Sequence, residues 1–158
     1  MPGSDVPAWS LRASSDGDFE WAFELHKAAL RSYVEQTWGW DEAVQRRMFA
    51  DGFCRHARHV IQVAAQDVGV LVVEDRPHEL YLGLLELLPA WQNRGIGTEI
   101  LRWLLAQAAN AGRALKLQVL RANPRAVALY ERQGLRVVSR DQIRLVMRAE
   151  AATTDIGA

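Results

Sequence analysis

Three apolar runs follow one another in this chain and constrain its fold more than any other feature. They cover Val60 to Ala65, Val68 to Val73 and Leu80 to Leu88, and polar turns at Gln66-Asp67 and Asp75-Arg76-Pro77 separate them. Apolar runs of this length, bounded by turn residues, are typical of buried strands. Because the turns are short, we predict that the three strands form an antiparallel meander.

Helical patterns flank the meander on both sides. Ahead of it, apolar residues over 19–34 recur at three- and four-residue spacing, which predicts an amphipathic helix. Asp41 caps a second short helix that we expect to turn Val44, Met48 and Phe49 inward. The other expected elements are a strand over Trp9 to Arg12, a helix from Thr98 to Gly112, a strand over Leu115 to Leu120, a helix from Asn123 to Gly134, and strands near Arg136 to Ser139 and Ile143 to Arg148.

Length and charge limit the class of protein. A chain of 158 residues that is 49% apolar and 24% charged is long enough for one core and too short for two. We expect one domain over 9–148 and a flexible tail over 149–158, which has no apolar period. The 19 basic and 19 acidic residues cancel, so no net field favours nucleic acid or an anionic membrane as a partner.

Cysteine usage bears on the compartment and on metal binding. Cys54 is the only cysteine, and the first residues lack a secretory pattern. The apolar runs are also too short to cross a bilayer, so we expect a soluble, cytoplasmic protein. Cys54, His56 and His59 are three potential ligands without a second cluster, and no metal site is predicted.

The sharpest local motif is Gln92-Asn93-Arg94-Gly95-Ile96-Gly97-Thr98, between an apolar strand and an amphipathic helix. The first amides of a helix lack intrahelical partners and the macrodipole is positive there, so an anion can bind. Gly95 and Gly97 would let a pyrophosphate approach, and Arg94 and Thr98 would add donors. A turn that uses glycine for geometry alone is the alternative interpretation. Ile100 replaces the third glycine of the dinucleotide fingerprint and the Walker lysine is absent, which disfavours a nicotinamide cofactor and a P-loop.

A second motif begins where Asn123 precedes a proline. This pair predicts a capped helix with proline at its first position. Tyr130 follows Asn123 by seven residues, or two turns, so both lie on one face of the helix with the small Ala126 between them. Taken alone, the pattern is explained by Asn123 acting only as a cap and Tyr130 only as a packing residue.

Together the two motifs resemble the GNAT superfamily of N-acetyltransferases over about residues 9–148. Residues 92–97 match its Q/R-x-x-G-x-G/A pyrophosphate loop, and residues 85–89 resemble the strand end that precedes this loop. The second motif resembles its N-x-x-A-x-x-x-Y-x-x-x-G segment. The residues that carry this second match are Asn123, Ala126, Tyr130 and Gly134.

This resemblance implies both a fold and an activity. The fold is α+β in α/β/α layers, with a mixed, mostly antiparallel sheet of six to seven strands and about four helices. The activity is direct transfer of an acetyl group from acetyl-CoA to a primary amine of a small molecule or peptide, without a metal. A non-catalytic acyl-CoA sensor and a protein-interaction module with a vestigial pocket are the alternatives.

The resemblance also assigns roles at the coenzyme. The strand over 85–88 splays from its neighbour and pairs with the pantetheine arm, and an amide near Leu85 or Leu87 polarises the acetyl carbonyl. Tyr130 donates a proton or hydrogen bond to the coenzyme sulfur, and Asn123 bonds the pantetheine chain. The complete expected coenzyme-binding set is Leu85, Leu87, Leu88, Gln92, Asn93, Arg94, Gly95, Ile96, Gly97, Thr98, Asn123, Ala126 and Tyr130.

A general base is not obligatory, because holding amine and thioester in contact supplies much of the rate. Glu79, ten residues before Pro89, matches the place of a glutamate that takes the amine's proton through water in some GNAT members. A solvated carboxylate at a strand start is the alternative. Glu86 is closer to the loop, but strand alternation predicts that it lies on the opposite face. Glu79 is therefore the expected catalytic partner of Tyr130.

The acceptor pocket implied by the resemblance involves the first two helices. Aromatic and acidic side chains there suit a cationic amine; the alternative is that the tryptophans are core or interface residues, and a tryptophan-rich surface allows a homodimer. The Trp-Gly-Trp-Asp-Glu run resembles one in a poorly characterised bacterial GNAT subgroup. The expected acceptor-binding residues are Tyr33, Glu35, Trp38, Trp40 and Glu42.

Overall fold

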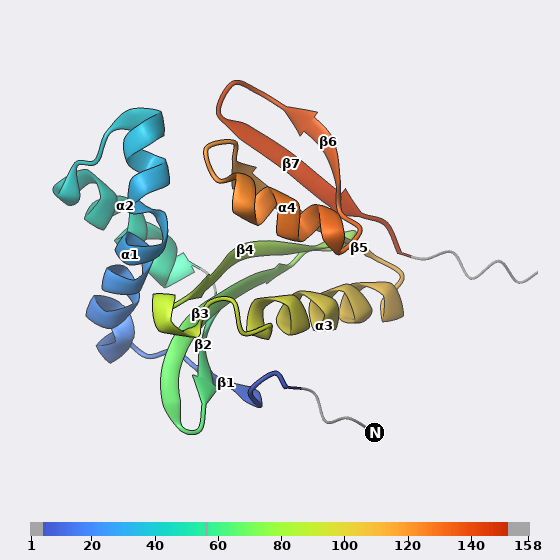
Figure 1. Cartoon of the computed structure of the whole chain (residues 1–158), viewed down its shortest axis with the longest axis horizontal. Coiled ribbons are helices and arrows are strands. Elements are labelled where there is room, and N and C mark those ends of the chain that lie inside the picture. Colours follow the sequence, from blue (N-terminus) through green and yellow to red (C-terminus); the bar gives the residue numbers. More distant parts are fainter. Residues whose placement is uncertain (1–4, 56, 152–158) are drawn as a thin grey trace, which may run out of the picture.

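The computed structural model describes residues 5–55 and 57–151. One seven-stranded sheet carries helices on its faces (Figure 1). This arrangement is the expected α+β class with a mixed sheet. In chain order the elements are β1 (Trp9–Ala13), a 3₁₀ turn (Asp16–Asp18), α1 (Phe19–Trp38), α2 (Glu42–Arg55), β2 (Arg58–Val63), β3 (Gln66–Asp75), β4 (Glu79–Leu87), a 3₁₀ turn (Pro89–Trp91), α3 (Ile96–Asn110), β5 (Ala114–Leu120), α4 (Pro124–Arg132), β6 (Arg136–Arg140) and β7 (Arg144–Ala149).

The strand order is β1-β2-β3-β4-β5-β7-β6, and β4 with β5 is the parallel pair of an otherwise antiparallel sheet. The β4–β5 register begins with Glu79 opposite Ala114 and ends with Leu82 opposite Leu117. Both strands continue beyond these residues. The expected splay between β4 and its neighbour is therefore confirmed.

The two faces of the sheet carry separate apolar clusters, and β3 shows how alternation divides them. Leu71 belongs to the larger cluster, which includes the buried stripe of α3. Val70 and Val72 belong to the smaller cluster, which α1 and α2 complete with Phe23 and Phe49. Because side chains of a strand alternate between faces, helices cover the sheet from both sides. No helix in the described part of the chain combines the length and apolar character needed to span a membrane.

The expected orientation of α2 is wrong at two positions. Val44 and Met48 are 37% and 62% exposed, whereas Phe49 is 7% exposed. The helix packs through Phe49 and Phe53, whose rings both meet the ring of Phe19 edge-on. These large rings set the buried stripe of the helix, and the two smaller residues are turned away from the core.

The expected first turn of the meander is also displaced. Gln66 and Asp67 begin β3, and Ala64 and Ala65 make the turn with φ of 50° and 65°. Asp67 is held at the strand start because its carboxylate accepts a hydrogen bond from Gln62 Nε2 at 2.9 Å. The polar residues that indicated a turn instead make contacts across the hairpin.

A bulge in β4 changes the orientation of the strand. Val72 pairs with Leu84 and Val73 pairs with Leu82, so Gly83 is the extra residue. One inserted residue reverses the alternation of all that follow. Glu79 and Glu86 therefore lie on the same face, the one covered by α1 and α2, and the prediction of opposite faces is wrong.

An ion-pair cluster joins β1, the 3₁₀ turn and β3. Arg12 lies 2.9 Å from Asp18 and 2.8 Å from Asp67. Hydrogen bonds from Arg12 and from the Ser15 amide lower the pKa of Asp18 from 3.8 to about 2. An Asp with a depressed folded-state pKa stabilises the fold above its ordinary pKa, and this contribution is lost as the pH falls through about 2.

Asp18→Asn should therefore lower the free energy of unfolding near neutral pH, by about 1–2 kcal/mol for a partly exposed pair. Denaturant unfolding at several pH values measures the effect. The difference from the wild type should shrink on acidification toward pH 2, where the wild-type carboxyl protonates. A difference that stays constant over the acid range would contradict this account.

Candidate active site

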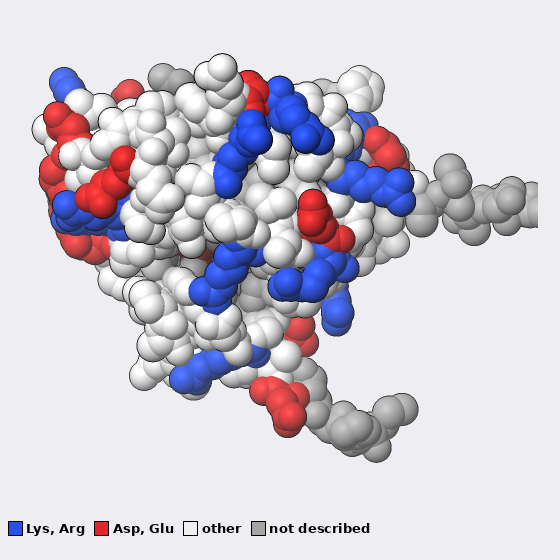
Figure 2. Space-filling view, turned by 45° about the horizontal axis from the view of Figure 1, so that its top comes forward, with Lys and Arg blue, Asp and Glu red and all other residues white. Residues whose placement is uncertain are grey.

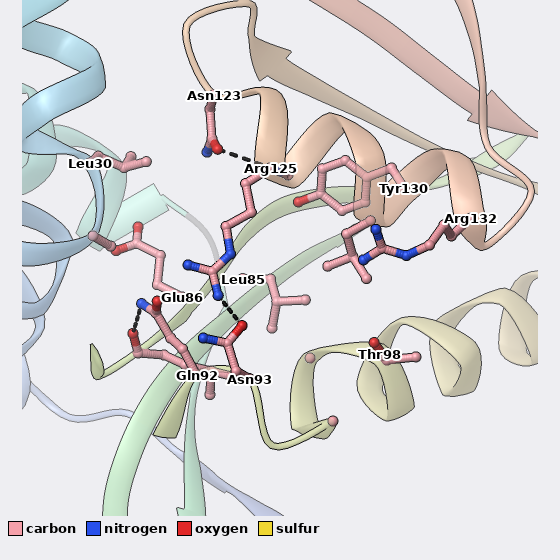
Figure 3. Close-up of a pocket in the computed structure, with 16 residues that line it drawn as sticks. Leu30, Leu85, Glu86, Gln92, Asn93, Thr98, Asn123, Arg125, Tyr130 and Arg132 are labelled. Carbon is pink, nitrogen blue, oxygen red and sulfur yellow. Dashed lines mark hydrogen bonds between the residues drawn. The ribbon is translucent and has the colours of Figure 1, made fainter. Parts of the chain in front are cut away.

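A cavity of about 420 Å³ opens where β4 and β5 diverge (Figure 3). The end of β4, the loop before α3, the first turn of α3, the segment that begins α4 and the middle of α1 contribute to its walls. The lining residues are Ala29, Leu30, Leu85, Glu86, Leu87, Gln92, Asn93, Gly95, Gly97, Thr98, Asn123, Arg125, Ala126, Leu129, Tyr130 and Arg132.

The two glycines of the loop have different reasons to be glycine. Gly95 has φ of 86°, and a Cβ there would meet Val6 Cγ2 at 2.8 Å, so the fold itself requires glycine. A Cβ on Gly97 would meet Leu87 Cδ1 at 3.9 Å, which is an ordinary contact. Gly97 lines the cavity in the first turn of α3. Packing therefore does not require glycine at this position.

Gln92 anchors the loop to the preceding strand. Its Nε2 donates to the carbonyl of Leu87 at 3.0 Å. Three members of the expected coenzyme set do not line the cavity. Ile96 is fully buried in the core, Leu88 packs against the smaller cluster, and Arg94 lies over the Trp91 ring at 4.7 Å.

Two cavity arginines on α4 were not anticipated. Arg125 and Arg132 line the cavity, and Arg125 donates to Asn93 Oδ1, joining α4 to the loop (Figure 3). The local excess of arginine in this part of the sequence could have indicated them. Residues 121–148 contain seven arginines and two acidic residues. Figure 2 shows several groups of Lys and Arg side chains on the face of the molecule that it presents. The balanced net charge of the whole chain concealed this excess.

Asn123 and Tyr130 lie on the cavity side of α4. Asn123 Oδ1 accepts a hydrogen bond from the Ala126 amide at 3.2 Å, so its cap role is present, and its amide nitrogen is left to donate. The phenol of Tyr130 points into the cavity (Figure 3). Burial, assisted by the Glu86 carboxylate, raises the pKa of Tyr130 to about 12. The phenol is therefore a neutral donor at physiological pH.

Glu86 is a buried carboxylate at the centre of this arrangement, with 5% of its surface exposed. Its Oε1 lies 2.7 Å from His26 Nδ1 of α1, and its Oε2 is buried without a hydrogen-bond partner among the described residues. If the Glu86 carboxylate is ionised it only accepts; in that state Nδ1 carries the proton, and Nε2 of a neutral ring is an acceptor. His26 lies within the helical pattern of residues 19–34, but the sequence alone did not reveal its pairing with Glu86.

The structure does not bring Glu79 to the cavity. Its carboxylate is 2.9 Å from Arg148, 3.4 Å from Arg76 and 3.8 Å from Lys116. These cations belong to β7, the turn before β4, and β5. Glu79 therefore forms ion pairs that connect β4 with β5 and β7.

The five expected acceptor residues also lie outside the lining of this cavity, and three of them contact neighbours in the sequence. Glu35 pairs with Arg31 at 2.8 Å, and Trp40 Nε1 donates to Glu42 at 2.8 Å. Trp38 is 51% exposed and lies under Arg144 of β7 at 5.1 Å. The expected set that this cavity does not contain is Tyr33, Glu35, Trp38, Trp40 and Glu42.

A second cavity, of about 330 Å³, lies between α1, α2 and the sheet. His26 lines this cavity, while its hydrogen-bond partner Glu86 lines the first one. The pair therefore bridges the two spaces. The lining residues are His26, Gln45, Met48, Phe49, Gly52, Arg58, Val72, Glu74, Tyr81, Gly83 and Leu84.

Three potential metal ligands lie close together in the sequence, at Cys54, His56 and His59. Within the described residues, no group of three or more His, Cys, Asp or Glu side chains is placed to hold an ion. His56 lies outside the described residues, and the Cys54 side chain is not described either. The predicted absence of a metal stays a prediction, and so does the flexible tail, most of which lies outside the described residues.

Comparison with known proteins gives a consistent family match. Residues 21–135 match the family model described as the acetyltransferase (GNAT) family. Among solved structures, the chain is similar to PaiA N-acetyltransferase from Thermoplasma acidophilum in complex with coenzyme A, with a TM-score of 0.73 and 15% identity over 90% of this chain and 99% of that one. It is also similar to the ribosomal-protein-S18-alanine N-acetyltransferase from Escherichia coli, with a TM-score of 0.68 and 17% identity over 96% and 99%. A third is yncA, a putative acetyltransferase from Salmonella typhimurium with acetyl-CoA, with a TM-score of 0.59 and 14% identity over 91% and 94%.

Proposed function

Because the chain belongs to the acetyltransferase (GNAT) family, we propose that it transfers the acetyl group of acetyl-CoA directly to a primary amine. The observation that carries this proposal is the single cavity in which the start of α3 and the phenol of Tyr130 face the gap between β4 and β5. A helix start that lacks a side chain at Gly97 suits a pyrophosphate. A neutral phenol suits a leaving thiolate.

The coenzyme half of the proposal rests on backbone donors and arginines. The pyrophosphate would lie on the amides around Gly97, and Arg125 and Arg132 would add charge-assisted bonds to phosphate oxygens. Beyond Leu82, β4 no longer pairs with β5. Its free backbone edge is available to pair with the amides of the pantetheine arm, as one strand pairs with another.

In the proposed reaction, the amine arrives protonated and first loses a proton. Its nitrogen then attacks the thioester carbon, a C–N bond forms and the C–S bond breaks. The thiolate takes a proton from Tyr130, and the remaining extra proton of the nitrogen passes to the phenolate and restores Tyr130. The products are an N-acetyl amine, free coenzyme A and one proton from the original ammonium group.

We assign the first proton transfer to the pair of His26 and Glu86 in place of Glu79. The pair bridges the two cavities, so an amine in the second cavity can meet a thioester in the first. Glu86 holds the imidazole through Nδ1, and Nε2 takes the proton. Glu79 is occupied by three cations at the other end of β4.

The remaining parts of the proposal rest on the sequence. The single cysteine supports the cytoplasm as compartment, and a homodimer stays a possible assembly. The protein acceptor named for the Escherichia coli relative does not identify the acceptor here, because 17% identity supports only the fold. A non-catalytic acyl-CoA sensor would need the coenzyme half alone, and the buried His26–Glu86 pair beside Tyr130 favours an enzyme.

An acceptor screen tests the proposal. The purified chain is incubated with acetyl-CoA and a panel of amines and peptides, and free thiol is measured. We expect thiol release that depends on an acceptor and an acetylated product of matching mass. Calorimetric binding of acetyl-CoA without thiol release from any acceptor would instead support the sensor.

A further inference from the structure

A second buried charge on the α1–α2 face has no role in the chemistry above. Arg58 begins β2, and its Nε and Nη1 atoms are buried without a hydrogen-bond partner among the described residues. Its guanidinium carbon lies 4.6 Å from the Phe49 ring centroid and 4.7 Å from that of Phe53. Arginine stays charged in proteins, and ring contacts replace only part of the hydration that these donors lose.

The unpaired donors border a space rather than a sealed core. Arg58 lines the second cavity together with His26. One face of α2 forms the wall between them through residues at helical spacing, and Met48 at the rim is 62% exposed. The residues of this wall are Gln45, Met48, Phe49 and Gly52.

Arg58, in the lining of this space, and Glu86, behind His26, carry opposite charges. The Glu74 carboxylate of the lining is paired with Arg76. Arg58 is paired with Val72 of β3, and Glu86 is paired with Val70 of the same strand. Both side chains leave the same face of the sheet, from strands about 10 Å apart. Glu86 Oε2 is also without a partner among the described residues. The space therefore has a free acceptor beyond His26 at one end and free donors at the other.

Building on the proposed function, we infer that the acceptor is a small amine that also carries a carboxylate, with its nitrogen at the His26–Glu86 pair and its carboxylate on Arg58. A guanidinium presents N–H donors in a plane that matches a carboxylate. Binding would satisfy a buried cation that the apo protein leaves unpaired. A diamine would instead place a second cation against Arg58, so simple diamines should be poor acceptors.

Matched acceptor pairs test this inference. Each pair consists of an ω-amino acid and the amine of the same chain length that lacks its carboxylate, in a series of increasing length, and diamines complete the panel. At the chain length that fits the cavity, we expect kcat/KM to be at least about tenfold higher for the acceptor with a carboxylate than for the matching amine without one. A difference of about tenfold is the scale of one charge-assisted hydrogen bond. Equal or better turnover of the amines without a carboxylate would overturn the inference.

Variants separate recognition from folding. Arg58→Gln should raise the acceptor KM by about tenfold or more and abolish the preference for the carboxylate, while the KM for acetyl-CoA stays unchanged. Arg58→Lys keeps the charge and should keep part of the preference. Arg47→Gln removes an exposed α2 arginine outside the cavity and should change neither constant.

These experiments distinguish failure of the acceptor inference from failure of the proposed acetyltransferase function. Thiol release from amines without a carboxylate, at rates that Arg58→Gln does not alter, would remove the acceptor inference and leave the acetyltransferase in place. Acetyl-CoA binding without thiol release from any member of the panel would remove both. If Arg58→Gln unfolds, the acceptor preference of Arg58→Lys relative to the wild type decides the question.

Discussion

Glu86→Gln is expected to lower kcat by about 100-fold or more, the scale of a lost general base, while acetyl-CoA affinity stays close to that of the wild type. Glutamine keeps the shape of the side chain and an acceptor for His26 Nδ1. It removes the negative charge that stabilises the imidazolium formed when Nε2 takes the amine's proton. Steady-state kinetics with an identified acceptor, and calorimetry with acetyl-CoA, measure the two quantities.

Glu79→Gln is the matched control for this variant. It removes the same charge from the same face of β4, but its partners are Arg76, Lys116 and Arg148. We expect a modest loss of stability and little change in kcat. The reverse result, with kcat lost in Glu79→Gln and kept in Glu86→Gln, would restore the sequence-based assignment.

His26 adds a test of whether the pair acts as a unit. His26→Gln should lower kcat about as much as Glu86→Gln does. The double variant should then be scarcely slower than either single variant, because groups that act together are not additive. Independent, multiplicative losses would show that the two side chains serve separate steps.

Tyr130→Phe is expected to lower kcat by about 10- to 100-fold with nearly unchanged coenzyme affinity, because phenylalanine fills the same space without a proton for the thiolate. The phenol has a pKa of about 12, so it stays protonated up to strongly alkaline pH. The rate should therefore show no loss from ionisation of this group well below pH 12.

Tyr33→Phe controls for loss of a hydroxyl on a residue outside both cavities. We expect its kinetics to match those of the wild type. If Tyr130→Phe turns over at the wild-type rate, Tyr130 has no part in the chemistry. If Tyr33→Phe is the slower variant, the acceptor lies where the sequence first placed it.

Local sequence patterns predicted the parts of the site that are themselves local. The loop before α3 and the cap of α4 are each contained in a few residues, because glycine, asparagine and proline specify backbone geometry at short range. The meander and the helix order followed from apolar periodicity for the same reason. These segments contain most of the residues that we propose bind the coenzyme.

The proposed acceptor half depends on contacts between distant residues, which local sequence patterns do not reveal. His26 and Glu86 are 60 positions apart, and the bulge at Gly83 decides which face Glu86 occupies. A glycine in a strand does not reveal whether it inserts a bulge. Phe49 and Phe53 pack over the Arg58 guanidinium, whose Nε and Nη1 atoms are buried. Predicting this contact required knowing which face of α2 meets the sheet.

The aromatic and acidic residues near the end of α1, which the sequence predicts to bind the acceptor, make local contacts outside the candidate cavity. Near the end of α1, Trp40 donates a hydrogen bond to Glu42, and Arg31 contacts both Glu35 and the Trp40 ring. All four residues are close in the sequence. A composition suited to a cationic ligand is thus also suited to local ion pairs and ring contacts. Whether such residues bind a ligand or only one another depends on whether their side chains face a cavity.

The most direct test of the account is the affinity of Gly97→Glu for acetyl-CoA, measured by calorimetry. An acidic side chain in the first turn of α3 suits the helix dipole, and the backbone at Gly97 accepts a Cβ without a clash, so the variant should fold. Gly17→Glu adds the same charge at an exposed turn outside the cavity as its control. We predict that Gly97→Glu loses measurable binding while Gly17→Glu binds like the wild type; wild-type affinity in a folded Gly97→Glu protein would contradict the account.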